Sequence, residues 1–123
     1  MTEEFPLLVI VDAANVVGSV PDGWWRDRRG AAQRLRDRLA ADGVPGHAVP
    51  VEIVLVVEGA ARGVESVPGV RVESAAGSGD DHMVELVAEA GGQPCLVVTA
   101  DRELRRRVTE LGADVAGPRT VRP

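Results

Sequence analysis

The sequence predicts an α/β fold: three layers, with a central, mostly parallel sheet of about five strands between helices. Short, unbroken apolar runs rich in β-branched residues recur along the chain, as expected for strands buried on both faces. Segments with helical periodicity alternate with these runs, and glycine and proline separate the two kinds of segment.

The N-terminal half is predicted to contain two strands and one long helix. In order, it holds a strand at 7–12, a loop at 13–22, a helix over about 23–42 and a strand at 51–58. Glycine and proline at 43–46 end the helix. Within the helix, Trp25 is expected to pack on the sheet together with Ala32, Leu35 and Leu39. Adjacent helical residues point in different directions, which leaves room for the other tryptophan, Trp24, to stay exposed. The alternative is that one of the two tryptophans stacks on an unpaired base.

The C-terminal half continues the alternation. It is predicted to contain a connector at 59–68, strands at 70–74, 95–100 and 113–116, and helices at 79–90 and 102–111. The residues expected to face the sheet are Met83, Val84, Val87 and Ala88 in the first helix, and Leu104, Val108 and Leu111 in the second. Residues 1–5 and 118–123 are expected to fray.

The length and composition narrow the possibilities further. The 123 residues predict a single domain, 1–123, with an ordered core over about 6–117. The single cysteine, Cys95, excludes an internal disulfide and a cysteine-based zinc site. The start of the chain is acidic and no apolar stretch reaches the ~20 residues of a membrane span, so a cytoplasmic protein without a membrane partner is expected. All 14 basic residues are arginine, which excludes lysine-dependent chemistry.

Acidic residues stand where the apolar runs end. Asp12 and Glu58 end the first two runs, Asp101 follows a third, and Asp80 and Asp81 open a helical segment. The carboxyl ends of parallel strands lie at one edge of a sheet, so these side chains are expected to converge. Carboxylates ~4 Å apart repel by about 4 kcal/mol at an effective dielectric of 20. A hard divalent cation would remove that repulsion.

Each acid also has an ordinary structural interpretation. Asp101 precedes a helix and is a suitable N-cap. Asp80 and Asp81 follow Ser78 in a first helical turn, where acids are favoured and a capping box can form. Glu58 is suited to a solvated turn. The coincidence of all these positions favours a metal site over the separate explanations.

Four ordered motifs resemble those of NYN domains, the PIN-like nucleases, and in particular their YacP-like branch. Residues 9–18 resemble the opening strand followed by Asp-Gly-Tyr-Asn, with alanines in place of the Gly-Tyr pair. Residues 54–58 resemble the second strand, which usually ends in Asp rather than Glu. Residues 79–85 and 97–102 resemble the Thr-Ala-Asp-x-x-Ile-Glu helix start and the Val-Thr-Ser-Asp-Arg motif.

The resemblance implies a PIN-like (Rossmann-like) fold and Mg²⁺- or Mn²⁺-dependent cleavage of RNA. It implies that the catalytic, metal-binding residues are Asp12, Asp81 and Asp101, with Asp80, Glu58 and Glu85 as secondary ligands or supporting groups. Asn15 would hold the loop after the first strand. The substrate-binding candidates are Asn15, Arg102, Trp24, Arg26 and Arg62.

We therefore predict a divalent-metal-dependent ribonuclease that acts on single-stranded RNA, with a homodimer as a possible assembly. Two alternatives stay open. One is a non-catalytic domain that binds RNA or protein through a degraded site, which Glu58 and the alanines at 13 and 14 suggest. The other is a phosphohydrolase for small phosphate esters, although position 14 is alanine where an Asp-x-Asp nucleophile motif would have its second aspartate.

Overall fold

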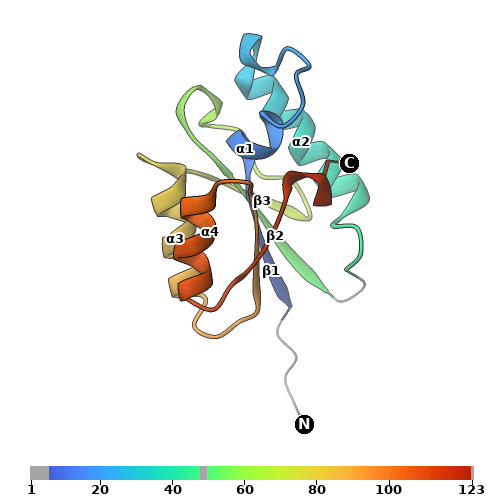
Figure 1. Cartoon of the computed structure of the whole chain (residues 1–123). Coiled ribbons are helices and arrows are strands. Elements are labelled where there is room, and N and C mark those ends of the chain that lie inside the picture. The colour runs from blue at the N-terminus through green and yellow to red at the C-terminus, as the bar shows by residue number, and fades with distance from the viewer. Residues whose placement is uncertain (1–5, 48–49, 123) are drawn as a thin grey trace.

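The computed structural model describes residues 6–47 and 50–122, which form an α/β fold around one parallel sheet (Figure 1). The sheet has five strands in the order β3-β2-β1-β4-β5. In chain order the elements are β1 (Leu7–Asp12), α1 (Ala13–Val17), α2 (Arg28–Asp42), β2 (Val51–Val57), β3 (Val70–Ser74), α3 (Gly79–Glu89), β4 (Cys95–Val98), α4 (Arg102–Glu110) and β5 (Asp114–Ala116). The predicted fold class is therefore confirmed.

Helices cover both faces of the sheet: α1 and α2 lie on one side, and α3 and α4 on the other (Figure 1). Successive side chains of β1 alternate between the two faces. Val9 and Val11 belong to one apolar cluster, which includes Leu35 and Leu39 of α2. Ile10 belongs to the other cluster, with residues of α3 and α4. This double burial explains why the strands read as continuous apolar runs.

The strand order reverses beside β1. The chain moves from β1 to β2 and β3 on one side of the sheet, and then crosses to β4 and β5 on the other. Such a reversal leaves a crevice at the carboxyl ends of the two strands that flank it, here β1 and β4. Functional residues are therefore expected in the segments that follow Asp12 and Val98.

The predicted helix over 23–42 begins later than expected. A 3-10 turn, η1 (Trp24–Arg26), comes first, and α2 starts at Arg28. Asp27 causes the break, because its carboxylate accepts a hydrogen bond of 2.9 Å from the Gly30 N–H and caps α2. The prediction for the tryptophans is consequently wrong: Trp24 packs against the core, whereas Trp25 is 51% exposed.

Four other expectations need correction. The predicted loop at 13–22 contains the short helix α1. In α3 it is Leu86, not Ala88, that is buried beside Val87, and Leu111 lies beyond the end of α4 with 49% exposure. The C-terminal segment is packed rather than frayed, because Val121 is buried in the core. Residues 1–5 and 123 lie outside the described residues.

Within the described part of the chain, no helix combines the length and the apolar character that crossing a membrane requires.

Candidate functional site

Asp12 is a buried acid at the centre of the sheet. It is the last residue of β1 and the N-cap of α1, and it is 5% exposed. Its Oδ2 accepts a hydrogen bond of 2.8 Å from the Thr99 hydroxyl, and its Oδ1 accepts one of 3.3 Å from the Asn15 N–H. Burial raises the pKa of the Asp12 carboxyl to about 6, although these two hydrogen bonds favour the ionised form.

The loops that follow β1 and β4 are fixed to each other by hydrogen bonds. The Thr99 hydroxyl, which donates to Asp12, also accepts a bond of 3.1 Å from the Asp101 N–H. The Asn15 side-chain oxygen accepts a bond of 3.1 Å from the Ala100 N–H. Asn15 therefore ties the first turn of α1 to the loop before α4.

Asp101 caps α4, as one of its two interpretations expected. Its Oδ1 accepts a hydrogen bond of 2.9 Å from the Leu104 N–H. A carboxylate that uses one oxygen for capping keeps lone pairs on the other oxygen. Capping and ligand binding by Asp101 are thus compatible.

The third side of the site comes from Glu58 and the start of α3. Glu58 Oε2 accepts a hydrogen bond of 2.7 Å from the Gly79 N–H. A Cβ atom at Gly79 would lie 3.0 Å from this oxygen, so glycine permits the close approach. Ser78 caps α3 by accepting a bond of 3.4 Å from the Asp81 N–H. Asp80 is partly buried beside them.

These segments enclose an open polar cleft of about 350 Å³ at the carboxyl edge of the sheet. Its lining residues are Asp12, Ala14, Asn15, Glu58, Ser78, Asp80 and Asp101. Burial raises the pKa of the Asp80 carboxyl, and the negative charges of Asp101 and Glu58 raise it further. The charges of Asp80 and Glu58 likewise raise the pKa of Asp12. The cleft therefore concentrates like charges, which is the condition that favours binding of a cation.

The side chains of the cleft suit a hard cation in donor type but do not form a closed cage. All of its charged donors are carboxylate oxygens, the ligands that Mg²⁺ and Mn²⁺ prefer. Among residues 6–47 and 50–122, no three His, Cys, Asp or Glu side chains lie close enough together to hold an ion. The arrangement thus fits an ion that is bound directly by one or two carboxylates and keeps most of its water, as Mg²⁺ commonly does.

The two neighbouring aspartates of α3 lie differently with respect to the cleft. Asp80 lines the cleft, whereas Asp81 does not. The Asp81 carboxylate is 67% exposed and forms a salt bridge of 2.9 Å with Arg107 of α4. Glu85, four residues further on, is also exposed and lies outside the cleft lining. The face that Asp81 and Glu85 share is therefore directed away from the cleft.

Of the predicted substrate-binding residues, Asn15 lines the cleft, whereas the other four are dispersed. Arg102 is exposed and does not line the cleft, and Arg62 bonds the Ala76 carbonyl at 3.4 Å. Arg26 lies over the ring of Trp25, 5.9 Å from its centroid. Trp24 lines a second pocket on the α1–α2 side of the sheet.

Two residues beside this network were not singled out from the sequence. Thr99 is fully buried and links two acids, and the Arg105 Nε donates a bond of 2.8 Å to the Thr99 carbonyl. A polar residue directly after a buried strand was the available signal for Thr99. The role of Arg105 depends on the position of α4, which the sequence pattern does not specify.

A solved structure is similar to the chain, namely a crystal structure of Rae1 (YacP) from Bacillus subtilis in a tryptophan-to-leucine mutant form. The TM-score is 0.70 at 18% sequence identity, and the match covers 93% of this chain and 71% of the other. This similarity shows a shared, YacP-like fold. Neither a family profile nor a curated protein matches the chain.

Proposed function

We propose that this protein is a divalent-metal-dependent ribonuclease of the NYN type, and that the cleft at the carboxyl edge of the sheet is its active site. The main supporting observation is the environment of Asp12, a buried acid that shares a polar cleft with Glu58, Asp80 and Asp101. The four NYN-like sequence motifs and the YacP-like fold support the same assignment.

The charge of the cleft explains why the proposal includes a metal. An RNA phosphate is an anion, and so are the acidic side chains that line the cleft. Without a cation the two would repel each other, and the net charge of −5 adds to the repulsion. A bound Mg²⁺ or Mn²⁺ would supply charge neutralisation at the phosphate and an acidified water for hydrolysis.

The residues of the cleft have separate roles in this proposal. Asp12, Asp80 and Asp101 are the candidates for the one or two direct ligands, because their carboxylates line the cleft. Thr99 and Asn15 hold Asp12 in position by hydrogen bonds. Glu58 has one oxygen bound to the start of α3, so we assign it a supporting role beside the ligands.

The test measures cleavage of single-stranded RNA in the presence of Mn²⁺ by the purified wild-type protein and three purified variants. Asp12→Asn and Asp80→Asn should each lower the rate by on the order of 100-fold or more, since each removes a charge that the cation requires. Asp81→Asn is the matched control, because it removes the neighbouring carboxylate that pairs with Arg107 outside the cleft.

The wild-type protein and Asp81→Asn should cleave at similar rates, and chelation of the metal should stop both reactions. Full activity of Asp12→Asn, with its fold verified by circular dichroism, would refute the assignment. Loss of activity in Asp81→Asn but not in Asp80→Asn would instead support the original sequence-based choice of ligand.

A further inference from the structure

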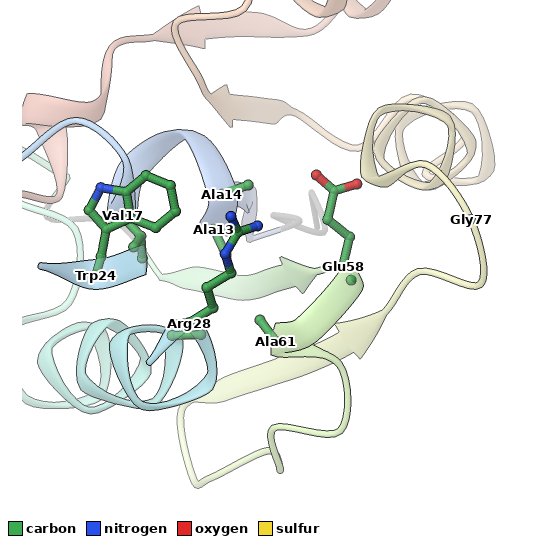
Figure 2. A pocket seen from close by; sticks show the side chains of 10 residues that line it. Ala13, Ala14, Val17, Trp24, Arg28, Glu58, Ala61 and Gly77 are labelled. Carbon is green, nitrogen blue, oxygen red and sulfur yellow. The ribbon is translucent and has the colours of Figure 1, made fainter. Parts of the chain in front are cut away.

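A second pocket of about 350 Å³ lies beside the acidic cleft, on the side of the sheet covered by α1 and α2 (Figure 2). The two cavities share two lining residues, Ala14 and Glu58. They are therefore adjacent parts of one surface depression with different chemical character. The cleft is lined mostly by polar side chains, whereas the second pocket is lined mostly by small or apolar ones.

The walls of this pocket combine an aromatic ring, a cation and a carboxylate. In Figure 2, Trp24 and Arg28 lie on one side and Glu58 on the other, with Ala13 and Ala14 between them. The Arg28 guanidinium lies 5.3 Å from the centroid of the Trp24 ring. Within residues 6–47 and 50–122, Arg28 forms no salt bridge, so its N–H donors are available to a ligand.

The pocket depends on small side chains after β1. Ala14 lines both cavities, and a larger side chain at this position would extend into the space between them. The motif that residues 9–18 resemble has an aromatic residue here. In this chain the aromatic ring comes from Trp24 instead, on a different wall.

We propose that this pocket is a subsite for one unstacked base of single-stranded RNA, next to the phosphate that the acidic cleft binds. The proposal rests on the function proposed above for the cleft. The volume lies at the lower end of the range for small-ligand sites, which suits a single base. Single-stranded RNA is recognised by stacking of splayed bases on aromatic rings and guanidinium planes, and Trp24 and Arg28 supply both.

The positions of the charges support this occupant. A nucleotide has an anionic phosphate joined to an uncharged, largely flat base. The phosphate would lie at the cleft with its cation, and the base would enter the neighbouring pocket. The Glu58 carboxylate, at the boundary, has an oxygen that does not bind Gly79 and can accept a hydrogen bond from a base amino group.

The first test measures binding of a labelled RNA hexamer, and of the same hexamer with one base removed at each position in turn. The wild-type protein is used with Mn²⁺ and the hexamers have a hydrolysis-resistant backbone, so that the cleft keeps its cation and the RNA stays intact. Removal of one particular base should weaken binding by about 5- to 150-fold, the range expected when a single stacked base is lost. Removal of bases that lie outside the pocket should have a much smaller effect.

Ala61→Leu, which adds volume to a wall of this pocket only, should weaken binding of the intact hexamer by a similar factor. In this variant, removal of the critical base should have no further effect. Trp25→Ala is the matched control, because Trp25 is exposed and lines neither cavity. The subsite would be refuted if removal of the base weakened binding to the Ala61→Leu variant as much as it weakens binding to the protein with the unaltered pocket. It would also be refuted if removal of no base weakened binding.

A second measurement needs no change inside the pocket. In Trp25→Phe, Trp24 is the sole tryptophan, and its fluorescence should be quenched by the intact hexamer but not by the hexamer that lacks the critical base. Quenching by both hexamers, or by neither, would overturn the proposal.

The outcomes separate the two proposals. If the wild-type protein cleaves RNA but no base is critical, the subsite is wrong and the nuclease assignment stands. If one base is critical and Trp24 is quenched, but the wild-type protein does not cleave RNA with Mn²⁺, the subsite stands and the nuclease assignment is wrong.

Discussion

Replacement of Asp12 by asparagine changes the unfolding free energy of the metal-free protein. We expect this change to be more favourable at pH 8 than at pH 4. Burial raises the Asp12 pKa from 3.8 to about 6. Below the lower value Asp12 is protonated in both the folded and unfolded states. Between the two values only the folded state holds the proton, so the free energy of unfolding falls as pH rises through this window. A difference of about two pKa units corresponds to about 3 kcal/mol.

Asparagine cannot ionise, so the variant lacks this fall in unfolding free energy with pH. The variant does lose one hydrogen bond, because an amide has a single acceptor oxygen, whereas the carboxylate accepts bonds from both Thr99 and Asn15. Loss of one such bond costs about 1–3 kcal/mol, at both pH values. The difference in unfolding free energy between Asp12→Asn and the wild-type protein should therefore rise by about 3 kcal/mol from pH 4 to pH 8.

Urea denaturation with a chelator present, followed by circular dichroism at several pH values, measures this difference. Titrating groups outside the cleft contribute equally to both proteins and cancel. A difference that stays constant between pH 4 and pH 8 would show that Asp12 has an ordinary pKa. The premise that burial places a costly charge at the end of β1 would then be wrong.

Two further predictions concern the same site. Thr99→Val removes the hydroxyl that links Asp12 and Asp101, so it should lower the free energy of unfolding by about 1–3 kcal/mol and raise the pKa of Asp12 further, as urea titration and the pH dependence of stability would show. Retained wild-type stability would exclude this link. Mn²⁺ at about 100 times its dissociation constant should raise the unfolding free energy of the wild-type protein by about 2.7 kcal/mol, measured by thermal denaturation. This gain should disappear in Asp12→Asn, and an equal gain in both proteins would place the ion elsewhere.

The sheet was predictable because its strands are buried on both faces. The run that ends at Asp12 has no polar interruption, and an acid at the end of such a strand must lie at the carboxyl edge of the sheet. The gathering of Asp12, Glu58 and Asp101 around one cleft follows from this parallel topology. These three acids could therefore be identified as candidate site residues from the sequence alone.

The choice between Asp80 and Asp81 depended on geometry that the sequence does not specify. Both lie in the first turn of α3, where adjacent residues point about 100° apart. Which of them faces the cleft depends on how the helix is rotated about its axis when it packs on the sheet. Arg107, from a different helix, pairs with Asp81 on the outer side.

The tryptophans show a similar limit. The helical pattern was extended back through Trp24 and Trp25 because no proline or glycine separates them from α2. The N-cap at Asp27 interrupts the helix instead, which changes the directions of both rings. The pocket beside the cleft arises from this interruption, so it could not be predicted from the periodicity.

The most direct test of the proposed active site is the position of manganese in crystals soaked with Mn²⁺, located by its anomalous scattering. We predict a peak within the cleft, at coordination distance from Asp12 and from Asp80 or Asp101. No peak in the cleft at saturating Mn²⁺, or a peak only beside Asp81 on the outer face of α3, would contradict it.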